Sequence, residues 1–341
     1  MTALCQSKPF IIDEDDCTIA RPELEDFPPD PQSQRKGLVF IHWVRLCGIL
    51  GRLAKNLSRS ATMEAPGLRS STHMELAAWI NTLPSQLQLR LDSKTTTTFD
   101  RDVHQLHLPY LTAVVIAHLR RSAQDLPQAL PPAILAASCT ARMLRDILVR
   151  GNTRFLMAIT CWYCGTAFIA LLQGSRIPQF AKDAEEGLSI LTSTIEQLQK
   201  MWPTANIIRQ AFDRMRKDLP TDVAANNLTS LSLIGRQPTS FPTENPAGIQ
   251  GENNGAAHQQ PGAAAEPESD WMELFPFVSA STNKIAECLL QNKQGGNVTR
   301  GMPSPANTFF YENVMNEYND FLDPLLMDYQ LDFSDLSSFQ E

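Results

Sequence analysis

The chain lacks the short motifs that mark many enzyme families. It contains no G-x-S-x-G nucleophile elbow, no G-x-G-x-x-G or G-x-x-x-x-G-K-[ST] phosphate loop, and no H-E-x-x-H zinc helix. No nucleophile–base pair or metal-ligand set can be assembled from the remaining residues. An enzyme is therefore the class of protein that the sequence favours least.

The chain also lacks the alternation of apolar and polar residues that marks β-strands, and no segment repeats at a fixed period. Between Gly37 and Leu219 the apolar residues instead recur near the 3.6-residue period of an α-helix. We therefore predict an all-α, multi-helix body. The pattern places its helices at about residues 37–57, 71–84, 101–122, 131–149, 155–172, 181–201 and 205–218.

No secretory signal opens the sequence, because the apolar residues 9–12 are too few and four acids follow them. The seven cysteines are odd in number and scattered along the chain. This usage is typical of reduced thiols in the cytosol or nucleus.

One uncharged stretch, residues 155–175, has the length of a membrane span. It contains Thr160, Gly165 and Thr166, and basic residues do not gather on one side of it only. These features favour a helix that is buried all round inside the body. We therefore expect no membrane partner.

Two residue pairs have the spacing of metal or redox sites. His104 and His107 share a helix face, but no third ligand lies near them in the sequence. Cys161 and Cys164 have a C-x-x-C spacing, but they lie in the most apolar stretch of the chain. We interpret the first pair as ordinary helix histidines and the second as small buried hydrophobic residues.

The predicted first helix carries a basic face, formed by Arg45, Arg52, Lys55 and Arg59. Such a face contacts phosphate in some proteins, but on an amphipathic helix it is more often a solvated surface. Because residues 1–300 are formally neutral, the body gives no electrostatic reason to bind nucleic acid unaided.

The last forty-one residues, 301–341, contain no Lys or Arg, eight acidic residues and eight aromatic rings. They supply the whole net charge of −8. Acids interleaved with bulky apolar residues are typical of segments that become ordered on a partner protein, as activation segments do. The candidate coactivator-contacting residues are Tyr318, Phe321, Leu322, Leu325, Leu326 and Phe333. The alternative is that residues 309–326 dock on the chain's own body as a closing helix.

These patterns divide the chain into four parts. Residues 1–36 are predicted to be an extended, acidic and Pro-rich lead-in, and residues 37–219 the helical body. Residues 220–300 are predicted to be a disordered linker, because Pro, Gly, Ala, Asn and Gln dominate most of that stretch. Residues 301–341 form the acidic–aromatic tail.

Several blocks of the sequence, taken in order, resemble the fungal binuclear zinc-cluster transcription factors of the branch similar to cutinase transcription factor. The blocks are Ile12-Asp-Glu-Asp-Asp-Cys17 with Glu25-Asp-Phe27, Phe40-Ile-His-Trp-Val-Arg-Leu46 with Ile49-Leu-Gly-Arg52, Trp79-Ile-Asn-Thr-Leu-Pro84, Leu106-His-Leu-Pro-Tyr110 and Trp202-Pro-Thr-Ala205. The resemblance covers about residues 10–220. It implies a partial helical regulatory domain of a nuclear transcription factor that ends in an activation segment.

The chain departs from this family in one respect. The family's DNA-binding module is a cluster of six cysteines that opens with C-x₂-C-x₆-C and holds two zinc ions. No part of this chain has that spacing, so zinc binding and direct DNA contact are assigned to no residue, and a DNA-binding partner subunit is one expected partner. The chain is then either a shortened gene product or part of a longer one.

Two other classes of protein remain open. A small-molecule sensor would hold a lipophilic ligand in an apolar cavity near residues 155–172. A membrane-anchored protein would need that same stretch to span a bilayer. The leading interpretation is a fungal-type transcriptional regulator, acting in a metabolic or secondary-metabolite gene cluster through protein contacts.

Overall fold

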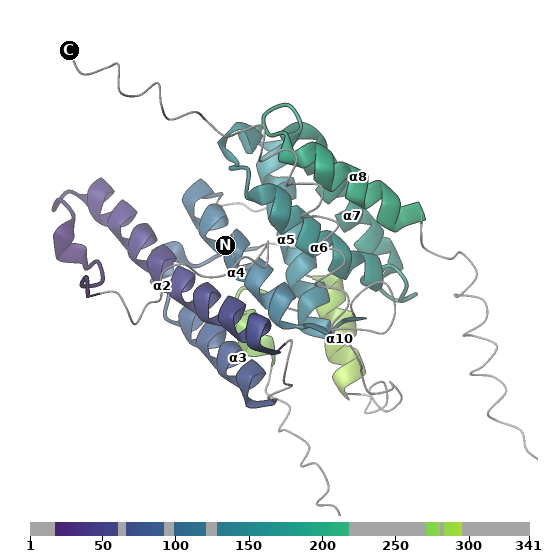
Figure 1. The fold of residues 1–341 in the computed structure, drawn as a ribbon, viewed down its shortest axis with the longest axis horizontal. Coiled ribbons are helices and arrows are strands. Elements are labelled where there is room, and N and C mark those ends of the chain that lie inside the picture. Colours follow the sequence, from purple (N-terminus) through teal and green to yellow (C-terminus); the bar gives the residue numbers. More distant parts are fainter. Residues whose placement is uncertain are drawn as a thin grey trace, which may run out of the picture.

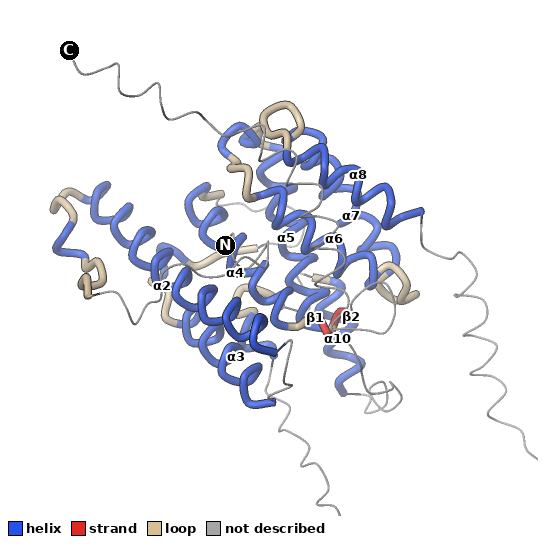
Figure 2. Tube along the Cα trace, viewed as in Figure 1, coloured by secondary structure: helices blue, strands red, loops and turns tan. Residues whose placement is uncertain are grey.

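The computed structural model describes residues 18–60, 66–91, 99–120, 128–217, 271–279 and 283–294. This part of the chain is helical, as the periodicity predicts, and the fold is all-α. Its helices are α2 (Pro31–Ser60), α3 (Pro66–Asn81), α4 (Arg101–Ala117), α5 (Pro131–Val149), α6 (Thr160–Gly174), α7 (Ala181–Leu198), α8 (Thr204–Lys217) and α10 (Lys284–Gln294). Two-residue strands, β1 (Leu119–Arg120) and β2 (Gln128–Ala129), pair antiparallel where the chain leaves α4 (Figure 2).

The helices are arranged around α4, α5 and α6, which pack against one another in the middle of the molecule (Figure 1). α2 and α3 lie side by side on one flank, and α7 and α8 form the opposite flank. α10 comes from the far C-terminal part of the chain and packs against α5. The core therefore runs through the middle of the body, with a helix pair on each side.

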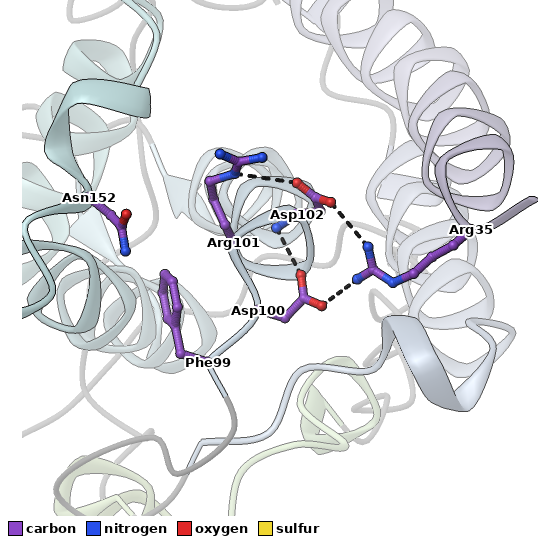
Figure 3. A pocket seen from close by; sticks show the side chains of 6 residues that line it. All are labelled: Arg35, Phe99, Asp100, Arg101, Asp102 and Asn152. Atoms are coloured by element: carbon purple, nitrogen blue, oxygen red, sulfur yellow. Dashed lines mark hydrogen bonds and ion pairs between the residues drawn. The ribbon is translucent and has the colours of Figure 1, made fainter. Parts of the chain in front are cut away.

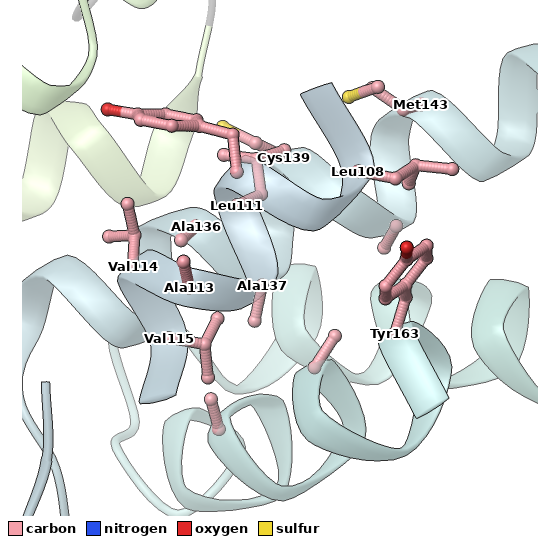
Figure 4. Close-up of a cluster of buried hydrophobic side chains, with 14 of the residues drawn as sticks. Leu108, Leu111, Ala113, Val114, Val115, Ala136, Ala137, Cys139, Met143 and Tyr163 are labelled. Carbon is pink, nitrogen blue, oxygen red and sulfur yellow. The ribbon is translucent and has the colours of Figure 1, made fainter. Parts of the chain in front are cut away.

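The central core is made of apolar side chains from three helices (Figure 4). The labelled residues are Leu108, Leu111, Ala113, Val114 and Val115 of α4, Ala136, Ala137, Cys139 and Met143 of α5, and Tyr163 of α6. All are at most 2% exposed. Because several buried residues of α5 are alanines, α4 and α6 can each pack closely against α5.

α2 begins at Pro31, so the prediction that residues 31–36 are extended was wrong. Asp30 is the reason: its Oδ1 accepts hydrogen bonds from the main-chain N–H of Gln32 (3.1 Å) and of Ser33 (2.9 Å). Pro31 then occupies the first helical position, where no N–H is needed. Gly37 is required further along, because a Cβ there would lie 2.6 Å from the ring of Phe27.

α3 begins at Pro66, five residues before the predicted N-cap at Ser71 or Thr72. The Pro-Gly pair that predicts a break is therefore the first turn of the helix. α4 begins at Arg101 as predicted, with Asp100 as its N-cap, and it ends at Ala117 rather than at residue 122. Pro109 lies inside this helix.

α5 agrees with its predicted bounds, and Gly151 follows it with a φ of 64°, the left-handed conformation expected at such a helix end. α6 begins at Thr160, not at Phe155, because residues 152–155 form a separate 3₁₀ turn. With 15 residues, α6 is shorter than the roughly 20 that a membrane span needs. Of the described helices, α2 has the length and hydropathy of a span over Pro31–Leu57, and 44% of that window is buried in the body.

The largest departure concerns the predicted linker. Within residues 220–300, the described stretches 271–279 and 283–294 form a 3₁₀ turn, η5 (Trp271–Leu274), and α10, and both pack on the body. We call these two stretches the docked segment. The prediction of a disordered linker was wrong for them.

The contact between α6 and α8 should contribute strongly to stability. Phe168 and Phe212 stack with ring centroids 3.7 Å apart and are at most 1% exposed. We expect Phe212→Ala to lower the free energy of unfolding by about 3–5 kcal/mol, measured by urea denaturation, because it leaves a cavity under α8. Val149→Ala, at a side chain that is 77% exposed, is the control and should change it by less than about 0.5 kcal/mol. A small effect of Phe212→Ala would mean that α8 does not pack as described.

Candidate functional site

Three of the motif blocks meet around the indole of Trp79. Its Nε1 donates a hydrogen bond of 3.0 Å to the main-chain oxygen of His42 on α2. Its ring stacks on Tyr110 of α4, with centroids 5.2 Å apart and planes 22° apart. The hydroxyl of Tyr110 donates in turn to the main-chain oxygen of Leu274, at 2.8 Å. These contacts join α2, α3 and α4 to the docked segment.

The docked segment packs on the body through apolar and aromatic side chains. Leu274 and Phe275 are at most 1% exposed. The ring of Phe275 meets those of Trp271 and Phe277 edge to face, at centroid distances of 6.3 and 6.2 Å. Asn81, at the end of α3, donates to the main-chain oxygen of Glu273 (3.2 Å).

α10 completes the docking on the α5 side. Asn283 caps the helix, since its Oδ1 accepts from the main-chain N–H of Ala286 (3.1 Å), and its Nδ2 lies 3.4 Å from the hydroxyl of Ser138 on α5. Ile285 and Ala286 are at most 1% exposed, and Leu289 is 9% exposed. Sequence reasoning missed this segment, although an aromatic cluster at residues 271–277 follows a long stretch poor in aromatics and signals it.

His104 and His107 do not form a site together. The Nδ1 of each ring donates to a main-chain oxygen four residues earlier, from His104 to Asp100 (2.7 Å) and from His107 to Val103 (2.8 Å). The His107 ring lies between Trp79 and Phe277, with both centroid distances 6.1 Å. Among the described residues no group of three or more His, Cys, Asp and Glu side chains could hold a metal ion.

His104 faces a buried charge cluster on α5. Asp146 is 2% exposed and accepts an ion pair from Arg142 (2.6 Å) and a longer one from Arg150 (3.5 Å). The Nε2 of His104 is 3.8 Å from the same carboxylate. Burial lowers the pKa of His104, although its bond to the main-chain oxygen of Asp100 and the charge of Asp146 act in the opposite direction. The two arginines compensate the buried carboxylate within the α5 side of the contact, and the ring of His104 is the part of α4 that packs against it.

The C-x-x-C pair is buried, as the sequence interpretation expects. Cys161 and Cys164 are 0% exposed, as is Cys139 on the neighbouring helix. Burial raises the pKa of Cys139 and of Cys161 to about 12, and that of Cys164 well above its ordinary value. Because the thiolate is the reactive and metal-binding form, these protonated thiols act as small core side chains.

One surface cavity, of about 350 Å³, lies at the start of α4 (Figure 3). Arg35 of α2 reaches into it and forms ion pairs with Asp100 and, at 3.1 Å, with Asp102. Asp100 also accepts from the main-chain N–H of Asp102 (2.9 Å) and of Val103 (3.1 Å). The polar groups are thus engaged in capping α4 and attaching α2 to it.

A second cavity, of about 300 Å³, lies between α2 and α3. The basic face predicted on the first helix borders it with Arg45 and Arg52, and Arg52 pairs with Glu75 of α3. Neither cavity is lined by α6, where the sequence places the pocket of a lipophilic sensor.

The candidate coactivator-contacting residues Tyr318, Phe321, Leu322, Leu325, Leu326 and Phe333 lie outside the described residues, as does the whole of residues 301–341. Their role stays a prediction. The structure describes instead the segment that precedes them, which ends at Gln294, with six residues between it and the tail.

Comparisons with known proteins found no match to any family model, curated protein or solved structure. What can be said of the class of protein therefore comes from the motif blocks and from the way the fold joins them.

The buried imidazole of His107 should make stability depend on pH. Burial lowers its pKa to about 4, against an ordinary value of 6.5, so between these values the unfolded chain binds more protons than the folded one. The stability that this difference provides is present above pH 6.5 and is lost as the pH falls toward 4.

Lowering the pH from 7 to 5 should therefore reduce the free energy of unfolding by about 2 kcal/mol through His107 alone. Urea titrations of the wild-type chain and of His107→Leu at both pH values measure this, and the variant should lose less stability by about that amount. Equal losses in the two proteins would show that His107 titrates normally in the folded state.

Docking of the C-terminal segment should depend on its central ring. Phe275→Ala removes a side chain that is 1% exposed and should speed proteolytic cleavage within residues 271–294, because the segment then detaches from the body more often. Met157→Ala, at a side chain that is 50% exposed, is the control. Unchanged cleavage in Phe275→Ala would mean that this ring does not hold the segment.

Proposed function

We propose that this chain is a fungal-type transcriptional regulator that acts in the nucleus, within a metabolic or secondary-metabolite gene cluster. Its helical body presents the tail, residues 301–341, to a coactivator or to the general transcription machinery. It reaches promoters through a DNA-binding partner subunit or an upstream module, since the given sequence holds no six-cysteine cluster.

The observation that carries this proposal is the composition of the tail together with its attachment. The tail has eight acids, eight aromatic rings and no basic residue. The docked segment fixes the chain to α5 through buried side chains, up to Leu289, shortly before this tail. Apolar residues interleaved with acids stay soluble and can bind in an apolar groove of a partner protein. Because the docked segment anchors the chain shortly before the tail, the tail can reach only partners near the body.

The arrangement of the motif blocks supports the class of protein. The blocks at residues 40–46, 79–84 and 106–110, which carry the resemblance to zinc-cluster regulators, contact one another through His42, Trp79 and Tyr110. The block at residues 202–205 also contributes to packing, because Trp202 donates to the main-chain oxygen of Leu156 (3.1 Å), although Leu156 belongs to no block. These four blocks thus have packing roles in the body, which is what the blocks of a single domain would have.

A reporter assay tests the proposal. The full chain is fused to a DNA-binding module of known target, and reporter expression is compared with that of a variant in which Tyr318, Phe321, Leu322, Leu325 and Leu326 are all Ala. Expression should fall to the level of the DNA-binding module alone, because the variant loses the apolar groups that would bury in the partner.

The matched control replaces five polar residues of the same tail with Ala, at Asn307, Asn313, Asn316, Asn319 and Gln330. It should keep most of the wild-type expression at equal protein level. If the apolar variant activates as well as the wild-type chain does, the tail does not act as an activation segment.

A further inference from the structure

The loop between α5 and α6, residues 150–159, is fixed by side chains from two other parts of the body. Gln105 of α4 donates to the main-chain oxygen of Phe155, at 2.8 Å, and Trp202, just before α8, donates to that of Leu156, at 3.1 Å. The side chain of Leu156 is 3% exposed, so it anchors the same stretch in the core. The neighbouring side chains of this α5–α6 loop therefore start from a fixed main chain.

This fixed loop presents apolar side chains to solvent. Phe155 is 38% exposed and Met157 is 50% exposed, on either side of the buried Leu156. Met201, the neighbour of the Trp202 that bonds to the loop, is 37% exposed. One exposed apolar side chain is common on a protein surface, but several at one place mark an interaction site. Because their main chain is already fixed, less conformational entropy is lost when a partner covers them.

Two arginines border this apolar surface. The guanidinium carbons of Arg101 and Arg154 lie 4.7 and 4.8 Å from the centroid of the Phe155 ring. Both side chains are exposed. A guanidinium that stacks on a ring uses its face, so the N–H groups in its plane remain available as donors. The Nε of Arg101 is also 3.5 Å from Asp102, whereas Arg154 forms no ion pair within the described stretches.

These residue types indicate the chemistry of the partner. Phe, Met and Arg are enriched in protein–protein interfaces relative to the rest of the surface. Guanidinium donors pair well with carboxylates, and methionine side chains adapt to apolar groups. Nucleic acid phosphates would match the arginines but not the methionines, because such interfaces are mostly polar. A second copy that docked with the same face would bring arginine against arginine, which is unfavourable.

We propose that this surface binds a segment of another protein in which acidic residues alternate with apolar ones. The carboxylates of that segment pair with Arg154 and Arg101, and its apolar side chains cover Phe155, Met157 and Met201. The proposal does not depend on the transcriptional function, because it concerns described residues of the body and not the tail.

Fluorescence anisotropy tests the proposal with a synthetic probe. The probe is a short fluorescein-labelled peptide that alternates Asp with Leu and Phe, and it is titrated with the full chain. It should bind, and a higher salt concentration should weaken the binding. Arg154→Glu should weaken it about tenfold, because it places a like charge against the carboxylates. Met157→Ser should weaken it about fivefold, because less apolar surface is then covered.

Matched controls are available on other faces of the body. Arg176→Glu reverses the charge of an exposed arginine between α6 and α7, and Met74→Ser replaces a methionine of α3 that is 62% exposed. Both variants should bind the probe as the wild-type chain does. Two further peptides, with Asn in place of Asp or Ser in place of Leu and Phe, should each bind the wild-type chain at least about tenfold more weakly. Thermal melting, followed by circular dichroism, checks that each variant keeps its helical body.

Three results would overturn the proposal. The first is that the Asp-containing probe does not bind the wild-type chain. The second is equal binding of the Asp and Asn peptides, or equal binding of the probe by Arg154→Glu and the wild-type chain. The third is that Arg154→Glu accelerates amide hydrogen exchange at residues 314–326, which would mean that the chain's own tail covers this surface. The reporter assay above changes only residues of the tail, so failure of one proposal does not imply failure of the other.

Discussion

The fold depends on the indole of Trp79, which is buried at the meeting point of three helices. A buried N–H without an acceptor costs about 1–3 kcal/mol, so the position of α2, which supplies the oxygen of His42, is coupled to that of α3. The stacked ring of Tyr110 adds α4 to the same unit, and its hydroxyl needs an acceptor for the same reason. That acceptor is Leu274, which belongs to the docked segment. One set of directional contacts therefore links the N-terminal flank of the body to a segment of the chain 164 residues beyond Tyr110.

The interior on the other side of α4 contains a buried charge cluster. Asp146 is almost fully buried, and a carboxylate in that position is tolerated only with partners close by. Arg142 and Arg150, each one turn away along the chain, supply them, and the Nε2 of His104 lies 3.8 Å from the same carboxylate. Removing one partner would leave an uncompensated buried charge, which is strongly destabilising. Both ion pairs join residues one turn apart along the chain, so α4 meets this cluster through the ring of His104 and is held on its other face by the stacked rings of Tyr110 and Trp79.

The sequence predicts this fold well where local signals and the apolar period coincide. α5 is the best example, since Pro131 opens it, Gly151 follows it, and the residues between show an uninterrupted helical period. The predicted start of α2 was wrong because a Pro-rich stretch is usually extended. Here Asp30 caps the helix with its side chain, and Pro31 therefore occupies the first helical position. The prediction for the docked segment was wrong for a different reason. The aromatic cluster at residues 271–277 signals an apolar segment, but the partners that bury it lie on α3, α4 and α5 and cannot be identified from residues 271–294 themselves. Within the site, Trp79 and Tyr110 belong to motif blocks that the sequence analysis identifies. The hydrogen-bond acceptor of the indole could not be predicted in the same way, because it is the main-chain oxygen of a residue 37 positions away.

The docked segment also affects how the protein is made. Between Lys217, the last residue of α8, and Gln294, the last of α10, the ribosome adds 77 residues. At roughly 5–20 residues per second this takes about 4–15 s. During that interval helices α2 to α8 have been synthesised, while the apolar side chains that Leu274 and Phe275 later cover are still exposed. A nascent chain in this state would be a natural substrate for chaperones. A transcript that ends before residue 271 would encode a body whose apolar side chains are never covered by the docked segment.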